Sequence, residues 1–258
     1  MSVEGIDISR DGGIVTVTFN RPERRNAITF AMWKALAGLF TDFAADETLR
    51  GVILTGAGNC FSAGADIADF AQTRATMEQG IVYEEWVDAA CDAIAGLGRP
   101  VIAAIRSFCY GGACNLAMAC DFRFVSPDAR MAIPAAKLSI VYGVRGTARL
   151  LALVGLAEAK LFYAAKPFDA EHALRAGFAD SIDADPVAAA QVWLAETASL
   201  APLSIAGAKE ILTMLAMPDR PFDADKADAA IMRALTSDDY AEGRAAFGAK
   251  RASRFQGR

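Results

Sequence analysis

Hydrophobic and polar side chains follow three distinct patterns near the start of the chain. Residues 13–19, GIVTVTF, alternate between apolar and polar side chains, which predicts a strand with one buried face. Residues 30–43 repeat apolar side chains three or four positions apart, the spacing of an amphipathic helix. Residues 51–55, GVILT, are almost continuously apolar and predict a short buried strand.

The alternation of strand and helix patterns continues to about residue 165. The expected elements are a helix over 76–97, a strand and then a helix within 100–121, a strand over 122–125, a short extended piece at 131–134, and helices over 144–155 and 157–165. Strands that alternate with helices in this way favour an α/β core.

The pattern changes at Pro186, after which the sequence is nearly all helical in character. We therefore expect a core over residues 1–185 and a helical C-terminal region over 186–258. Several side chains of this region are too apolar to remain in water, and we expect them to face a partner surface, as in an oligomer. They are Trp193, Leu194, Ile211, Leu212, Leu215 and Met232.

Composition narrows the class of protein. Hydrophobic residues make up 54% of the 258 residues and charged residues 22%, enough for a sizeable core. The net charge of −5 argues against nucleic acid as the main partner, and no apolar run is long enough for a secretory signal or a membrane span. We expect a cytoplasmic protein without a membrane partner.

Histidine and cysteine usage bears on the chemistry. The five cysteines form no CxxC pair and are expected to be reduced, packed thiols. His172 is the single histidine, so we expect no metal site. It lies in FDAEHALRAG, where Asp169 can cap a short helix that ends at Gly177, and no nucleophile motif accompanies it. Catalysis by a Ser-His-Asp or Cys-His group is therefore not expected.

Two glycine-rich turns suggest a binding device. In PVIAAIRSFCYGGACNLAMACD, an apolar run reaches Gly111-Gly112 and continues as a helix; FSAGADI, residues 61–67, repeats the device after the strand at 51–55. The first turn of a helix has unpaired N–H donors and a partial positive charge, and glycine lets a ligand approach the backbone closely. The two turns are thus candidates for holding a negatively charged atom.

These two blocks, together with NRPERRNAI, FDAEHALRAGFADSI and EGRAAFGAKR in the same order, resemble the crotonase (enoyl-CoA hydratase/isomerase) superfamily over nearly the whole chain. The resemblance implies a spiral of repeated ββα units and a homotrimer or hexamer formed through a C-terminal helical trimerisation region. It also implies a coenzyme A thioester as substrate, with no further cofactor. The family's shared chemistry is stabilisation of a thioester enolate by two backbone N–H groups, an oxyanion hole.

The positions that match the family's motifs indicate which residues of this sequence form the site. The resemblance implies that the oxyanion hole consists of the amides of Ala65 and Gly112. The residues expected to contact CoA are Ala63, Asp66 and Ile67 beside the first turn, Arg24 and Arg25 near the nucleotide, and Phe247 and Lys250 over the phosphates. A solvated polar loop is an equally good interpretation of the two arginines.

The sequence departs from the hydratase pattern at both glutamates. Asn115 occupies the first glutamate position and Ala135 the second, which puts both hydration and the one-glutamate double-bond shift in doubt. Tyr142 resembles the arrangement in methylmalonyl-CoA decarboxylase, although that pattern has a histidine where Ala65 stands. Tyr142 with Asn115 is therefore a candidate catalytic pair, with an aromatic wall of the acyl site as the alternative.

Glu84 and Glu85 lie on the helix expected to pass over the acyl group, and either could supply a carboxylate from a new place. The preferred interpretation is that they are solvated surface residues. Three functions remain open. The first is an acyl-CoA enzyme of the enoyl-CoA hydratase/isomerase type. The second is a malonyl-type acyl-CoA decarboxylase, and the third is a non-catalytic acyl-CoA-binding protein.

Overall fold

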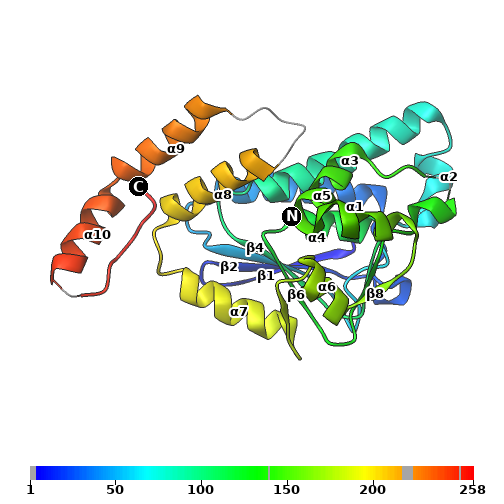
Figure 1. Cartoon of the computed structure of the whole chain (residues 1–258), viewed down its shortest axis with the longest axis horizontal. Helices are drawn as coiled ribbons and strands as arrows, with labels where there is room; N and C mark the ends of the chain where they lie inside the picture. The colour runs from blue at the N-terminus through cyan, green and yellow to red at the C-terminus, as the bar shows by residue number, and fades with distance from the viewer. Residues whose placement is uncertain (1–3, 139, 217–222, 250) are drawn as a thin grey trace.

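The computed structural model describes residues 4–138, 140–216, 223–249 and 251–258 (Figure 1). Its main sheet has six strands in the spatial order β1-β2-β3-β4-β6-β9. Their bounds are β1 Ile6–Asp11, β2 Ile14–Phe19, β3 Gly51–Gly56, β4 Val101–Ile105, β6 Phe122–Val125 and β9 Ser181–Ile182. Strand β1 pairs antiparallel with β2, and all later neighbours are parallel.

Helices cover both faces of this sheet, which explains the continuously apolar β3 and β4. Val52 and Leu54 of β3 belong to the core that includes α1 (Phe30–Ala44) and α3 (Met77–Gly96). Ile53, between them, packs with Leu194 of α7 (Pro186–Thr197) on the opposite face. A parallel strand that is buried on both faces has a continuously apolar sequence rather than an alternation of apolar and polar residues.

A second, small sheet contains three strands that lie far apart in the sequence. These are β5 (Phe108–Tyr110), β7 (Arg130–Ala132) and β8 (Phe168–Asp169), in that spatial order. The sequence pattern predicts one strand running to the Gly111-Gly112 pair, and this is wrong. Strand β4 ends at Ile105, Ser107 adopts a positive φ of 50°, and the chain enters the second sheet before it reaches the glycines.

The remaining helices follow the predicted pattern except α2, which was not predicted. They are α2 Phe70–Thr73, α4 Gly112–Ala119, α5 Val144–Tyr163, α6 Ala170–Ala176, α8 Pro202–Ala216, α9 Ala224–Leu235 and α10 Asp238–Ala249. The two helices predicted over 144–165 form α5, with non-helical dihedrals at Gly155 between them. Asp169 caps α6 by accepting a hydrogen bond from the His172 N–H, and Gly177 ends it with a left-handed conformation, as predicted.

The helical C-terminal region divides between the core and the outside. Trp193 and Leu194 of α7 are covered by the chain's own sheet, with the Trp193 ring 4.5 Å from that of Phe122. Leu212, Leu215 and Met232 of α8 and α9 stay exposed. In Figure 1, α9 and α10 extend to the left of the molecule, at the opposite end from α2.

No single helix among the described residues is long and apolar enough to cross a membrane. Taken together, α7 and α8 meet the length and composition requirement, but they are bent by 116° relative to each other.

Candidate active site

The turn that begins α4 requires glycine. Gly111 adopts φ 55° and ψ −117°, a conformation that residues with a side chain rarely adopt, and its N–H donates to the carbonyl of Ala132. Gly112 is the first residue of α4, as predicted, so its N–H has no acceptor in the preceding turn. A Cβ at Gly112 would lie 3.0 Å from the Trp33 ring and 3.6 Å from the Ala65 nitrogen.

The other turn lies well beyond the end of β3, in a loop rather than at a strand end. Gly64 has a φ of 94°, and a Cβ there would lie 2.4 Å from the Tyr110 carbonyl and 3.3 Å from the Gly112 nitrogen. Glycine at position 64 thus permits the turn at residues 61–67 to pack closely against the turn at Gly111-Gly112.

Pairing with Ile28 fixes the direction of the Ala65 N–H. Ile28 donates its N–H to the Gly64 carbonyl and accepts from the Asp66 N–H, both at 2.8 Å. In a parallel bridge the residues flanking Ala65 make both bonds, so the Ala65 N–H points away from Ile28. Among the residues that the structure describes, neither the Ala65 nor the Gly112 N–H has an acceptor.

Both turns line a cavity of about 120 Å³, which we call the glycine-turn cavity. Its apolar wall includes Trp33, Ile67, Phe70, Val87, Leu138 and Ile140. Ala63, Ala65, Gly112, Asn115, Ala135 and Tyr142 also line it, so most of the predicted site residues meet here. Two free N–H donors in an apolar cavity suit an oxygen that gains negative charge, because little water competes for them.

Asn115 and Tyr142 are held in place around Gly146. Asn115 is buried, and its Oδ1 accepts a 3.4 Å hydrogen bond from Arg149. The Tyr142 hydroxyl donates to the Gly111 carbonyl at 3.2 Å, and burial raises its pKa well above the ordinary value. A Cβ at Gly146 would lie 2.7 Å from the Tyr142 ring. Tyr142 is therefore a neutral hydrogen-bonding group at neutral pH.

Helix α3 contributes two carboxylates to the wall of the glycine-turn cavity. Glu84 and Asp88 line the cavity, whereas Glu85 is exposed and does not. The expectation that Glu84 is only a surface residue is therefore wrong, and that for Glu85 is confirmed. Sequence reasoning missed Asp88, although its spacing of four residues from Glu84 places both on one helix face.

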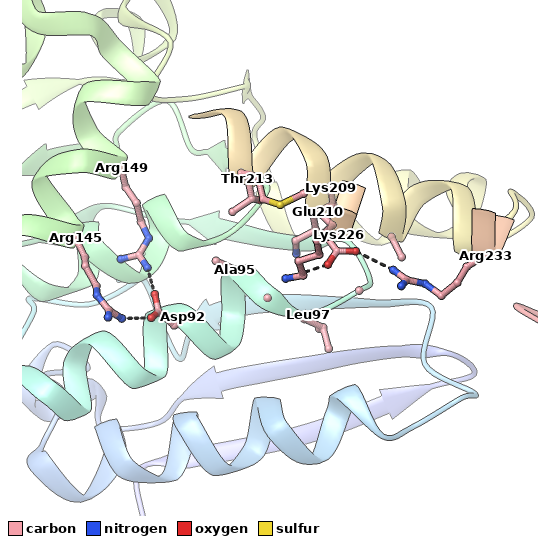
Figure 2. Close-up of a pocket in the computed structure, with 14 residues that line it drawn as sticks. Asp92, Ala95, Leu97, Arg145, Arg149, Lys209, Glu210, Thr213, Lys226 and Arg233 are labelled. Atoms are coloured by element: carbon pink, nitrogen blue, oxygen red, sulfur yellow. Dashed lines mark hydrogen bonds and ion pairs between the residues drawn. The ribbon is translucent and has the colours of Figure 1, made fainter. Parts of the chain in front are cut away.

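A second cavity, of about 330 Å³, lies between α3, α5, α8 and α9 (Figure 2). We call it the charged cavity because five basic and two acidic side chains line it. The basic ones are Arg145, Arg149, Lys209, Lys226 and Arg233, and the acidic ones Asp92 and Glu210. Figure 2 shows Asp92 bound by both Arg145 and Arg149 on one side, and Glu210 bound by Lys226 and Arg233 on the other.

Arg149 joins the two cavities. One of its terminal nitrogens donates to Asp92 at 2.6 Å and the other to Asn115 at 3.4 Å, and its side chain is only 5% exposed. Since Asn115 lines the glycine-turn cavity and Asp92 the charged one, this guanidinium forms part of the wall between them.

Four of the other predicted contact residues lie outside the cavity or at its edge. Ile67 is largely exposed at the cavity, and Asp66 forms an ion pair with Arg21 at 2.8 Å. Arg24 and Arg25 are exposed, and Arg25 lies over the Phe108 ring at 5.7 Å. Phe247 belongs to α10, and Lys250 lies outside the described residues.

The histidine lies apart from the two turns, whereas Cys60, Cys109 and Cys114 flank them, and the Cys114 N–H donates to the Gly111 carbonyl at 3.0 Å. No cysteine of the described residues lines the glycine-turn cavity. His172 Nε2 is 2.8 Å from Glu158 Oε2 on the neighbouring α5. All five cysteines are free and four are buried, as expected of packed thiols; burial raises the pKa of Cys91 to about 12.

Comparison with known proteins identifies the family. The model of the enoyl-CoA hydratase/isomerase family matches residues 9–258. The chain belongs to this family. The probable enoyl-CoA hydratase echA6 of Mycobacterium tuberculosis is 34% identical over 253 residues, covering 98% of this chain and 99% of its own. The short-chain-enoyl-CoA hydratase of Clostridium acetobutylicum is 35% identical over 70% of each chain.

Solved structures agree with this assignment. An enoyl-CoA hydratase/carnithine racemase from Magnetospirillum magneticum superposes with a TM-score of 0.92 at 34% identity, covering 100% of this chain and 97% of its own. A putative enoyl-CoA hydratase/isomerase family protein from Hyphomonas neptunium gives 0.92 at 31% identity, covering 98% of both chains. The α/β fold is that of crotonase-like proteins, and the protein is an enzyme of the enoyl-CoA hydratase/isomerase family.

Proposed function

We propose that the protein acts on acyl-CoA thioesters and stabilises the enolate of the thioester between the N–H groups of Ala65 and Gly112. One observation carries the proposal: two N–H groups that have no acceptor among the described residues lie close together on the wall of one apolar cavity. A thioester carbonyl oxygen placed there would gain charge as the enolate forms, and both donors would then bind it more strongly than in the ground state.

The proposal includes the assembly and the outer contacts. We infer a spiral of ββα units over residues 1–185 and a helical region over 186–258 that joins three or six copies in the cytoplasm. Exposed Leu212, Leu215 and Met232 support this because such apolar faces of α8 and α9 suit burial against another copy. In the same proposal, CoA contacts Arg24, Arg25, Ala63, Asp66, Ile67, Phe247 and Lys250, and no further cofactor takes part.

A matched pair of variants tests the oxyanion hole. Gly112→Pro removes the N–H at the first helical position, where proline is tolerated, while Gly112→Ala keeps it and adds a comparable contact with Trp33. We expect the proline variant to lose about 10²- to 10³-fold in kcat relative to the alanine variant. Equal rates for two folded variants would contradict the proposal.

Decarboxylation of a malonyl-type acyl-CoA is the second candidate. It is favoured by Asn115 and Ala135 at the positions of the two hydratase glutamates and by Tyr142 beside Asn115 in the cavity. Loss of CO₂ itself generates the enolate, so no strong base is needed. Assays of crotonyl-CoA and methylmalonyl-CoA in parallel separate the two reactions, while binding without turnover on an acyl-CoA panel would indicate a non-catalytic binding protein.

A further inference from the structure

Helix α3 presents two carboxylates to the glycine-turn cavity, one turn apart. Glu84 and Asp88 are separated by four residues and therefore occupy the same face of the helix. Both line the cavity together with Ala65 and Gly112. Acidic side chains are rare on such a wall without a partner, because an unpaired carboxylate is costly to desolvate.

The two carboxylates differ in their partners. Glu84 is engaged by Arg74 at 2.7 Å. Asp88 has only Arg145, whose Nε lies 3.7 Å from Oδ2, beyond hydrogen-bond reach. Arg145 directs a terminal nitrogen to Asp92 instead. Within the described part of the chain, no group donates a hydrogen bond to Asp88, so its oxygens are available to a ligand in the cavity.

The surroundings of Asp88 also favour proton transfer. Burial raises the pKa of its carboxyl, and the charges of Asp92 and Glu84 act in the same direction, while Arg145 and Arg149 on α5 oppose them. A carboxyl group with a raised pKa is the kind of group that serves as general acid and base.

Resting on the proposed function, we propose that Asp88 carries the proton in this enzyme and replaces the glutamates absent at positions 115 and 135. The carboxylate takes a proton from the carbon beside the thioester carbonyl. The C–H electron pair becomes the enolate double bond, and the carbonyl π pair moves to the oxygen held by Ala65 and Gly112. In a 3-enoyl-CoA, the Asp88 acid then returns the proton to the fourth carbon, which completes a double-bond shift without any other reactant.

Two reactions measure this step. The first is exchange of the α-protons of butyryl-CoA in D₂O, followed by NMR, and the second is conversion of a 3-enoyl-CoA to its 2-enoyl isomer. We expect Asp88→Asn to slow both by about 10²- to 10⁴-fold while the Kd for butyryl-CoA stays within about twofold. Glu85→Gln, an exposed neighbour on the same helix, is the control and is expected to retain full activity.

A second variant controls for the possibility that Asp88→Asn misfolds or that the asparagine forms new hydrogen bonds. In Asp88→Ala, added formate is expected to restore part of the exchange rate, because it supplies the missing carboxylate. Retention of more than a tenth of the activity by folded Asp88→Asn would overturn the role of Asp88 and leave the proposed function intact. If the wild type binds butyryl-CoA but catalyses neither exchange nor isomerisation, the role of Asp88 is overturned as well. If the wild type does not bind butyryl-CoA, the proposed function itself is overturned.

Discussion

The two cavities on either side of Arg149 use their charged groups in opposite ways. In the charged cavity, Glu210 and Asp92 are each bound by two basic side chains, so its charges are satisfied inside the protein. In the glycine-turn cavity, two N–H donors and the Asp88 carboxylate lack hydrogen-bond partners among the described residues. Polar groups that lack a hydrogen-bond partner in a cavity point to a ligand, whereas hydrogen-bonded ion pairs hold elements together.

The largest expected effect is that of removing the residue that the two cavities share. Arg149→Met deletes the bonds to Asp92 and Asn115. Breaking a buried ion pair is strongly unfavourable, so we expect a loss of about 3 kcal/mol in the free energy of unfolding, measured with urea.

Arg149→Lys is the matched control, since lysine keeps the charge but cannot bond Asp92 and Asn115 through two separate nitrogens. The free energy of unfolding should therefore fall by less than in Arg149→Met. A loss below about 1 kcal/mol in the methionine variant would mean that the wall between the cavities does not depend on this guanidinium.

A smaller effect is expected from filling the space beneath Tyr142. Gly146→Ala places a methyl group 2.7 Å from the Tyr142 ring and 3.0 Å from Asn115 Oδ1, and overpacking of this kind costs about 1–3 kcal/mol. We expect a lower melting temperature and weaker acyl-CoA binding.

Gly80→Ala in α3 serves as comparison, because its Cβ meets open space and should stabilise the helix by about 0.5–1 kcal/mol. Equal changes in melting temperature for Gly146→Ala and Gly80→Ala would contradict this prediction, because they would mean that Tyr142 and Asn115 can move to accommodate the methyl group.

Removal of the Tyr142 hydroxyl distinguishes Asp88 from Tyr142 as the group that transfers the proton, and it should change stability little. Tyr142→Phe removes one hydrogen bond, to the Gly111 carbonyl, so the free energy of unfolding should fall by about 1 kcal/mol. If Asp88 carries the proton, kcat for the double-bond shift falls by less than about tenfold. A fall of about 10²-fold or more would instead assign the proton transfer to Tyr142.

The smallest effect is expected at the rim of the charged cavity. Glu210→Gln removes the ion pairs with Lys226 at 3.1 Å and Arg233 at 2.9 Å, and both basic partners are 57% exposed. Exposed pairs contribute less than about 1 kcal/mol, and 1 M salt should abolish the difference from wild type in urea denaturation. A larger or salt-independent loss would show that α8 and α9 depend on this contact.

Long, strongly patterned elements could be predicted from the sequence, and short paired ones could not. The helices at 30–44 and 77–96 and the strand at 51–56 follow from local spacing alone. The extended piece predicted at 131–134 overlaps β7, but its pairing with β5 and β8 could not be predicted. These strands have two or three residues each and depend on pairing between distant segments. The chain turns at Ser107, where the polar pair Arg106-Ser107 interrupts the apolar run and could have indicated the division.

The candidate site shows the same division. Gly112 could be placed at a helix start because a glycine pair before an apolar helix has a local meaning. Asp88 could not be assigned to the cavity, since a helix of 20 residues carries charges on several sides and only packing decides which side meets the two turns. Likewise, Leu194 was expected to face a partner and is buried against the chain's own sheet.

The sequence by itself determined the α/β class, most element bounds and the two glycine turns, because spacing, capping and the conformational freedom of glycine act over a few residues. Only the tertiary structure decided that the Ala65 and Gly112 N–H groups share a cavity and that Asp88 faces it without a hydrogen-bonded partner. Such relations join segments far apart in the chain, and they depend on how helices pack on sheets rather than on local preference.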